Sequence, residues 1–388
     1  MIASVTGVNF YNKGAELMAY AVSREFSSWG ESYVPCAHLG IGTFAERRAA
    51  GLRSHVWMTN RQRDKLPGVP AVLASAGNAL PRTLLRRYEM VKDREVDVIL
   101  DASGFAFSDQ WGPGKAEKMA SLCQRWKAAG KRIVLLPQAF GPFTTARTRD
   151  ATAEILRNVD LVFARDESSF ENLNELRSDP AKVRLAPDFT TLLEPVPSHN
   201  AAHLVGRSCV IPNVRMLDKT AGGTSDAYLE FLVRVTSELT NGGDKPFVLI
   251  HEKTDRTLAE QLRDSVLKRH GVDVEIVSRP SALELKAIIG SSRLVVGSRF
   301  HGLVSALSQS VPCIATGWSH KYMELFRDYG VEEHAVQVTA AADAAVPLIE
   351  RLRSPEVYNA TRLRLSEKAG AQKEAARAMW DDIRAALD

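Results

Sequence analysis

The 388-residue sequence lacks several features that would assign it to a class at once. No apolar run approaches the ~18 residues needed to span a bilayer, and no basic-then-apolar signal opens the chain. The four cysteines, Cys36, Cys123, Cys209 and Cys313, form no Cys-x-x-Cys pair and have no metal-ligand spacing with histidine. We therefore expect reduced, buried thiols in a cytoplasmic protein, which would visit the inner face of a membrane only if its substrate lies there.

Strong charge of either sign is also missing. The formal net charge is +4, from 50 basic and 46 acidic side chains. Such a balance suits an anionic small substrate or weak attraction to anionic lipid headgroups, and it is too small to predict nucleic-acid binding. Hydrophobic residues make up 45% of the chain, which is normal for a globular protein, and the length suits two α/β domains.

The start of the chain has a strand–turn–helix pattern but not the full Gly-x-Gly-x-x-Gly motif of dinucleotide-binding folds. A strand over residues 2–7 precedes a polar turn, and a helix is expected over residues 14–28. In the turn, Asn12 and Lys13 could bind an anion or a sugar. Alternatively, Asn12 could simply cap the helix.

Strand and helix patterns then alternate along the whole chain. Short apolar runs predict further strands near residues 96–100, 131–136, 161–164, 183–186, 208–211, 246–250, 272–278, 294–296 and 311–315. A proline-rich, polar stretch at residues 193–203 is typical of a linker. We therefore predict an α/β protein with two Rossmann-like domains, residues 1–195 and residues 196–388.

Arginine is frequent between residues 37 and 95, where strong periodicity is absent. This stretch predicts either solvated helical faces and loops or a patch that faces a substrate or a membrane. The arginines concerned are Arg47, Arg48, Arg53, Arg61, Arg63, Arg82, Arg86 and Arg87.

In the first half, polar side chains follow the predicted strands. Asp101, Ser103 and Gly104 come after one strand, Gln138 after the next, and Arg165 after a third. Ligands of open α/β sheets bind beyond the carboxyl ends of the strands, so all five are candidate substrate contacts. Asp101 is also a candidate general base. Gln138 could equally be a satisfied turn amide, and Arg165 could form a structural pair with the aspartate that follows it.

The most informative stretch spans residues 294–330. One strand ends before Ser298, Arg299 and His301, with a helix expected over residues 302–309, and the next strand ends before His320 and Lys321. A helix N-terminus favours an anion, and arginine adds a forked contact. These residues therefore predict an anion site.

Three further residues of the second half, Asn213, Arg215 and His251, also follow predicted strands. We expect them to line the same crevice as the residues of the 294–330 stretch. They are therefore candidate substrate contacts.

A family resemblance rests on this same stretch. The run Gly-Ser-Arg-Phe-His-Gly-Leu-Val-Ser-Ala-Leu, followed by Val-Pro-Cys-Ile-Ala and Trp-Ser-His-Lys-Tyr, resembles the polysaccharide pyruvyl transferase family. The resemblance implies two Rossmann-like domains facing a cleft, similar to the GT-B glycosyltransferases. The first domain would face the acceptor and the second the donor, with a terminal helix that crosses back.

The resemblance also implies an activity. Pyruvate would pass from phosphoenolpyruvate to hydroxyls of a glycan or lipid-linked saccharide, giving a pyruvate ketal and phosphate. His301 would act as the acid, Arg299 and Arg165 would hold the anions, and Lys321 would assist the departing phosphate. This scheme needs no metal and no cofactor, and it allows a monomer or a homo-oligomer.

Two other functions stay open at this point. A nucleotide-sugar-dependent GT-B glycosyltransferase would share the architecture and could use the same helix start for a diphosphate. A non-catalytic glycan- or anion-binding module would use the same residues as ligand contacts only.

Overall fold

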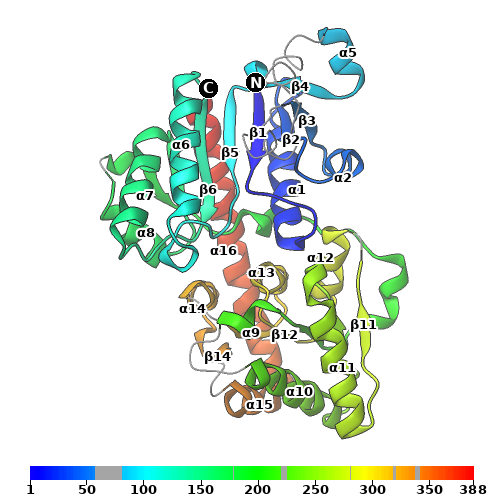
Figure 1. The fold of residues 1–388 in the computed structure, drawn as a ribbon. Coiled ribbons are helices and arrows are strands. Elements are labelled where there is room, and N and C mark those ends of the chain that lie inside the picture. Colours follow the sequence, from blue (N-terminus) through cyan, green and yellow to red (C-terminus); the bar gives the residue numbers. More distant parts are fainter. Residues whose placement is uncertain (57–80, 178, 220–224, 280, 318–319, 337–340) are drawn as a thin grey trace. The chain divides into compact units, whose positions relative to one another are not determined.

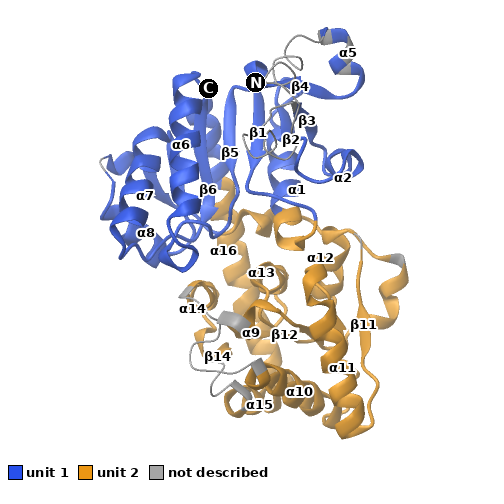
Figure 2. Cartoon of the chain, viewed as in Figure 1, with its two compact units in different colours: residues 1–10, 18–187, 378–388 blue, residues 11–17, 188–377 orange. Residues whose placement is uncertain are grey.

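The computed structural model describes residues 1–56, 81–177, 179–219, 225–279, 281–317, 320–336 and 341–388 (Figure 1). The chain forms two compact units (Figure 2). Unit 1 comprises residues 1–10, 18–187 and 378–388, and unit 2 comprises residues 11–17 and 188–377. This division differs from a single boundary after residue 195, because residues 11–17 make their contacts within the second unit.

The described strands of unit 1 form a parallel sheet in the order β4-β3-β2-β1-β5-β6-β7-β8. Their bounds are β1 (Ile2–Thr6), β2 (Val34–His38), β3 (Arg53–Val56), β4 (Met90–Lys92), β5 (Val98–Asp101), β6 (Arg132–Gln138), β7 (Leu161–Ala164) and β8 (Val183–Leu185). In register, Ser4 of β1 lies opposite Cys36 on β2 and Ile99 on β5. The central strands are apolar and buried along their length, as expected of a parallel sheet covered on both faces.

The helices associated with unit 1 are α1 (Lys13–Ser28), α2 (Phe44–Ala49), α5 (Arg82–Arg87), α6 (Gly114–Ala128), α7 (Ala146–Asn158) and α8 (Glu167–Asn174). The first turn of α1, residues 13–17, belongs to unit 2. Cys123 and Trp126 of α6 share a buried cluster with Ile155 of α7 and Ile133 of β6. These helices therefore cover the sheet and close its core.

Strands β2, β3 and β4 were not predicted, because they are short and partly polar. Within β3, the buried His55 ring lies 3.0 Å from the Ser4 hydroxyl through Nδ1 and 3.1 Å from Asp93 through Nε2. Hydrogen bonds thus stabilise a strand that apolar patterning does not reveal.

Arg47 corrects part of the predicted arginine-rich surface. Its side chain is buried, and its guanidinium donates to the carbonyl oxygens of Leu39, Ile41 and Gly42 at 3.1, 3.0 and 2.8 Å. Arg47 therefore fixes the loop before α2 instead of facing a partner. Arg61 and Arg63 lie outside the described residues.

The described strands of unit 2 form a second parallel sheet, in the order β11-β10-β9-β12-β13-β14. Their bounds are β9 (Cys209–Ile211), β10 (Phe247–Leu249), β11 (Glu275–Val277), β12 (Val295–Gly297), β13 (Cys313–Thr316) and β14 (Ala335–Val336). The helices are α9 (Arg215–Lys219), α10 (Ser225–Asn241), α11 (Arg256–His270), α12 (Ala282–Gly290), α13 (Phe300–Leu307), α14 (His320–Asp328), α15 (Ala341–Arg351) and α16 (Pro355–Leu387). This strand order is that of a dinucleotide-binding Rossmann sheet.

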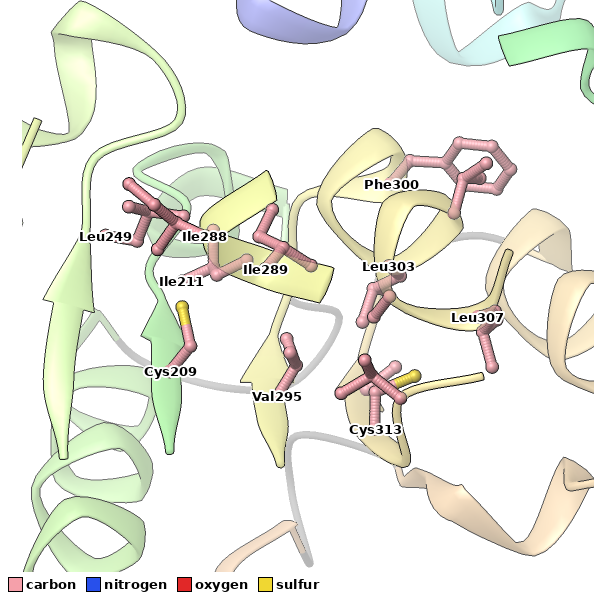
Figure 3. Packing of buried hydrophobic residues seen from close by; sticks show 14 of the residues in the cluster. Cys209, Ile211, Leu249, Ile288, Ile289, Val295, Phe300, Leu303, Leu307 and Cys313 are labelled. Atoms are coloured by element: carbon pink, nitrogen blue, oxygen red, sulfur yellow. The ribbon is translucent and has the colours of Figure 1, made fainter. Parts of the chain in front are cut away.

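Alternate residues of β9 face two different cores in unit 2. Figure 3 shows Ile288 and Ile289 of α12 and Leu303 of α13 in the same cluster as Cys209 and Ile211. The residue between them, Val210, belongs instead to the cluster formed with α10 and α11. Helices thus cover both faces of the sheet, which explains why its strands are continuous apolar runs.

The two parallel sheets with flanking helices confirm the predicted α/β class with two Rossmann-like sheets. All four cysteines are buried and free of disulfides, also as predicted. Helix α16 contributes residues 355–377 to unit 2 and its remaining residues to unit 1, where Trp380 packs against Trp29 at 6.1 Å between ring centroids. Among the described residues, no helix combines the length and apolar character required to cross a membrane.

Candidate active site

Each sheet reverses its strand order beside its first strand. The reversal lies between β1 and β5 in unit 1 and between β9 and β12 in unit 2. In open α/β sheets this switch point is where ligands bind, beyond the carboxyl ends of the strands. Of the predicted residues, Asp101 is the last residue of β5 and Ser103 follows that strand, whereas Asn213 follows β9 and Ser298 follows β12. Both predicted groups therefore stand at the switch point of their own unit.

In unit 1, the structure brings Asp101, Ser103 and Gln138 into one hydrogen-bonded group. Thr6 Oγ1 and Ser103 Oγ donate to Asp101 Oδ1 at 2.9 and 2.8 Å, and Gln138 Nε2 donates to Oδ2 at 3.1 Å. Burial raises the pKa of the Asp101 carboxyl, and these hydrogen bonds oppose that rise. Because Asp101 is 1% exposed and both its oxygens are engaged, it ties strand ends together and does not fit the predicted role of general base or sugar contact.

Gly104 and Arg165 complete the unit 1 group. Gly104 has a φ of +71°, which a glycine adopts without strain, and it turns the chain after Ser103. The backbone N–H of Arg165 donates to the Gln138 carbonyl oxygen at 3.0 Å, at the end of β7. The next residue, Asp166, caps α8 by accepting from the Ser169 N–H at 2.8 Å. Arg165 therefore stays a candidate anion ligand of unit 1.

In unit 2, α13 begins at Phe300, two residues earlier than predicted. His301 therefore lies in the first helical turn, and Arg299 is the N-cap without a side-chain capping bond. The signal was present in the sequence, since Phe300, Leu303, Val304 and Leu307 have the i, i+3, i+4, i+7 spacing of a buried helix face.

Arg299 has a different task from the one predicted. Its Nε donates to Asp255 Oδ2 at 2.8 Å, and its two terminal nitrogens contact Asp255 Oδ1 and Glu252 Oε2. The residue is 6% exposed. Burial raises the pKa of the Asp255 carboxyl, and the guanidinium opposes that rise. With its fork occupied by two carboxylates, Arg299 ties the segment after β10 to the turn after β12 and does not fit a direct anion ligand.

Asn213 and Ser298 form hydrogen bonds that stabilise this turn. Asn213 Nδ2 and Tyr322 Oη donate to the Ser298 carbonyl oxygen at 2.7 and 2.9 Å, while Tyr228 Oη donates to Ser298 Oγ at 2.9 Å. Ser298 is fully buried. Arg215, predicted as their neighbour, has a side chain that is 46% exposed. The hydrogen bonds of Asn213, Tyr228 and Tyr322 to Ser298 thus hold the start of α13 in place.

Residues 11–17 add the start of α1 to unit 2. Asn12 Oδ1 accepts from the first-turn N–H groups of α1, which confirms the capping interpretation, and its Nδ2 donates to Glu252 Oε2 at 2.9 Å. Lys13 is buried and donates from Nζ to Glu16 Oε2 at 2.6 Å. The other oxygen of Glu16 accepts from the Ala282 N–H at 2.9 Å, at the start of α12.

His301 stands between Gly14 and Asp188. Its Nε2 is buried without a hydrogen bond and lies 3.4 Å from Asp188 Oδ2. A Cβ added to Gly14 would lie 2.3 Å from His301 Nδ1, so that nitrogen faces the start of α1. Lys321 Nζ lies 5.3 Å from the centre of the Phe300 ring, also beside the first turn of α13. Asp188 follows the predicted strand at residues 183–186, and nothing in the sequence connects it with His301.

The second histidine, His251, is buried beneath this group. Burial lowers the pKa of its ring well below the usual value, and the charges of Arg299, His301 and Lys13 act in the same direction. Burial therefore favours the neutral form of His251, whose Nδ1 is buried without a hydrogen-bond partner. The remaining predicted histidine, His320, begins α14, and its side chain lies outside the described part of the structure.

Replacing Gly14 with alanine should displace the His301 ring, because a Cβ has no room beside Nδ1. A misplacement of this size is expected to lower kcat about 100-fold. Gly370→Ala in α16 is the matched control, since nothing lies within 4 Å of an added Cβ there. An unchanged kcat in Gly14→Ala would mean that the position of the ring does not matter for turnover.

Lys286 of α12 gives a pH-dependent stability. Its Nζ donates to the Thr190 carbonyl oxygen at 2.8 Å, and burial lowers the pKa of the ammonium from 10.5 to about 8. The unfolded chain thus holds this proton to higher pH than the folded chain. Unfolding takes up a proton between about pH 8 and pH 10.5, so the free energy of unfolding rises with pH through this window.

Lys286→Met should remove that rise, which is on the order of 3 kcal/mol across the window. Urea unfolding of both proteins at a series of pH values measures the difference. Lys268→Met, at an exposed position of α11, controls for the general loss of a lysine. If the free energy of unfolding of the wild-type protein did not rise from pH 8 upward, the lowered pKa assigned to Lys286 would be contradicted.

The chain is similar to a known protein family and to known proteins. The family model described as "Polysaccharide pyruvyl transferase" matches residues 12–320. The amylovoran biosynthesis protein AmsJ of Erwinia amylovora is 23% identical over 273 residues, which cover 66% of this chain and 65% of AmsJ. The chain thus matches just under two thirds of the length of that curated relative.

Two solved structures show the same fold over nearly the whole chain. Anabaena Alr3699/HepE in complex with UDP and glucose has a TM-score of 0.60 at 12% identity, and the match covers 100% of this chain and 98% of that one. A putative UDP-N-acetylglucosamine 2-epimerase from Listeria monocytogenes has a TM-score of 0.60 at 11% identity, covering 99% and 95%. They confirm the predicted likeness to the GT-B glycosyltransferase fold. With a family model that covers most of its length, the chain belongs to the polysaccharide pyruvyl transferase family.

Proposed function

We propose that the protein transfers pyruvate from phosphoenolpyruvate to two hydroxyls of a saccharide, forming a cyclic ketal and releasing phosphate. Family membership supports pyruvyl transfer as the type of reaction. The observation that carries the proposal is the place of His301, in the first turn of a helix whose N-cap makes no side-chain capping bond. An acid group and an anion-binding helix start then occupy the same few residues.

The donor carries a phosphate and a carboxylate on a small carbon frame. The N–H groups and the dipole at the start of α13 favour one of these anions, and the ammonium of Lys321 adds a positive charge beside Phe300. In this proposal Arg299 contributes by fixing the turn through Asp255 and Glu252. Its substitution therefore acts on the position of His301 and not on a direct contact with the donor.

The chemistry begins with a proton transfer. An N–H bond of protonated His301 breaks and a C–H bond forms at the methylene carbon, which leaves a carbocation-like centre at the neighbouring carbon. One acceptor hydroxyl attacks this centre, a second hydroxyl displaces the phosphate, and the ketal closes. The two hydroxyl protons are then shared between the phosphate and the histidine, which regains its acid form, so atoms and charges balance. A positioned acid of this kind accelerates such a step about 10²–10⁴-fold.

The acceptor is proposed to be a polysaccharide or its lipid-linked precursor. AmsJ, a relative over 66% of this chain, is an amylovoran biosynthesis protein. A saccharide with two neighbouring hydroxyls is also what ring closure to a ketal requires.

The test offers purified protein phosphoenolpyruvate together with a panel of galactosides, glucosides and mannosides, free and lipid-linked. We expect phosphate release and an acceptor whose mass increases by one pyruvate ketal. Parallel reactions contain UDP-sugars in place of phosphoenolpyruvate. Consumption of a UDP-sugar with no ketal would replace this proposal with a glycosyltransferase, and saturable donor binding without any product would indicate a binding module.

A further inference from the structure

The carboxylate of Asp188 is held in a defined orientation beside His301. Its Oδ1 accepts from the Thr190 N–H at 3.0 Å and from Thr190 Oγ1 at 2.6 Å, as the cap of the short helix Phe189–Leu192. Its Oδ2 points to His301 Nε2 at 3.4 Å. Asp188 is buried, and so is the Nε2 atom of His301, although the His301 side chain as a whole is 13% exposed. The two oxygens of Asp188 therefore have separate tasks.

Contacts with α12 and with the start of α1 fix the Asp188 turn and the His301 ring. Lys286 Nζ donates to the Thr190 carbonyl oxygen at 2.8 Å, so the Asp188–Thr190 turn is anchored to α12. Near Nδ1, the backbone of Gly14 lies so close to the ring that a Cβ added to it would be 2.3 Å from that nitrogen. The ring thus has a carboxylate beside Nε2 and the backbone of Gly14 near Nδ1, and the His301 side chain remains 13% exposed.

We propose that Asp188 is a positioning residue that keeps a proton on His301 Nε2 and leaves Nδ1 as the nitrogen that exchanges a proton with a substrate. A carboxylate can only accept a hydrogen bond, so the ring must present an N–H toward it. The separation is 3.4 Å, and Nε2 makes no hydrogen bond in this structure. Catalytic hydrogen bonds are often long without the substrate and tighten when it binds.

The consequence for catalysis rests on the proposed function. Protonated His301 carries N–H groups at both nitrogens and donates the one at Nδ1 to the methylene carbon of the donor. The neutral ring that remains keeps its Nε2–H toward Asp188, so no rearrangement is needed before Nδ1 is protonated again. Asp188 stabilises the positive charge of the ring before transfer and touches no substrate itself.

Asp188→Asn tests the inference directly. The amide keeps the helix cap, but it donates a hydrogen bond toward His301 where the carboxylate would accept one. Its Oδ1 can still accept from Thr190, while its NH₂ group takes the position of Oδ2 and donates toward His301 Nε2. We expect neutral His301 to carry its proton on Nε2 in the wild type and on Nδ1 in the variant. Long-range ¹H–¹⁵N spectra of the full chain with ¹⁵N-labelled histidine report the proton position without any substrate.

Asp179→Asn is the matched control, because Asp179 also caps a short helix, through the Ala181 N–H at 3.0 Å, and among the described residues no histidine contact of its carboxylate is present. It should leave the His301 signals unchanged. A wild-type His301 with its proton on Nδ1 would overturn the inference, and so would the same tautomer in wild type and Asp188→Asn. The wild-type spectrum alone decides the first point, even if the variant does not fold.

Turnover gives the second measurement. We expect Asp188→Asn to lower kcat about 10²–10⁴-fold, as a wrong tautomer does in other carboxylate–histidine pairs, with the KM for phosphoenolpyruvate changed little. A reversed tautomer in a protein without pyruvyl transfer would refute the proposed function and leave the Asp188–His301 assignment intact. Pyruvyl transfer with full kcat in Asp188→Asn would refute the assignment and leave the proposed function intact.

Discussion

His301→Gln is expected to lower the rate of pyruvyl transfer about 10²–10⁴-fold while donor binding is largely kept. Glutamine fills much of the space between Gly14 and Asp188 but has no proton to give at neutral pH. The start of α13 and Lys321 are not altered, so the contacts proposed for the anionic donor are kept. Single-turnover rates and calorimetric titration with phosphoenolpyruvate measure the two effects separately.

His270→Gln is the control for this variant. His270 is exposed at the end of α11, and its replacement should change neither rate nor binding. If His301→Gln lost donor affinity and turnover to the same degree, His301 would be a donor ligand and not the acid. That result would favour the binding role over the catalytic one.

Arg299→Met is expected to lower the free energy of unfolding by about 3–5 kcal/mol, the usual cost of removing one partner from a buried ion pair. The variant leaves Asp255 and Glu252 buried without their common cation. It also frees the turn after β12 from the segment after β10, so His301 loses its fixed position. Urea unfolding followed by circular dichroism measures the stability, and the transfer assay measures the loss of activity.

Two comparisons make this prediction specific. Arg263→Met removes an exposed pair with Asp264, and such pairs contribute about 0–1 kcal/mol. Arg299→Met with Asp255→Asn removes a negative charge along with the positive one and should recover part of the stability. If Arg299→Met were as stable as the wild type and only required a higher concentration of phosphoenolpyruvate, the result would support the direct anion contact predicted from the sequence.

Much of the fold was predictable, because buried parallel strands are continuous apolar runs and the helices between them have clear spacing. The runs at Val295–Gly297 and Cys313–Thr316 were located in this way, and with them the turn that carries His301. Strands such as Arg53–Val56 escaped because hydrogen bonds of His55, not apolar side chains, stabilise them. The pattern of apolar residues carries no information about such bonds.

The site was predictable by position but not by role. The predicted strand ends correctly placed Asp101, Asn213 and Arg299 at the switch points of the two sheets. The side chain of each, however, is hydrogen-bonded to residues far away along the chain, and the sequence gives no sign of these pairings. Arg299 meets carboxylates 44 and 47 residues away along the chain. Likewise, Asp188 and His301 come together only because η4 (Phe189–Leu192) packs against α13. Pairings of this kind follow from the three-dimensional packing alone.

The most direct test of the central claim is a transfer reaction with phosphoenolpyruvate in deuterated water, followed by mass spectrometry and NMR of the acceptor. The proposed acid step predicts an acceptor that carries a pyruvate ketal with at least one deuterium in its methyl group, together with phosphate release. Both signals should fall together in His301→Gln. Ketal formation without deuterium in the methyl group would contradict protonation of the methylene carbon, and an unmodified acceptor alongside a consumed UDP-sugar would contradict pyruvyl transfer itself.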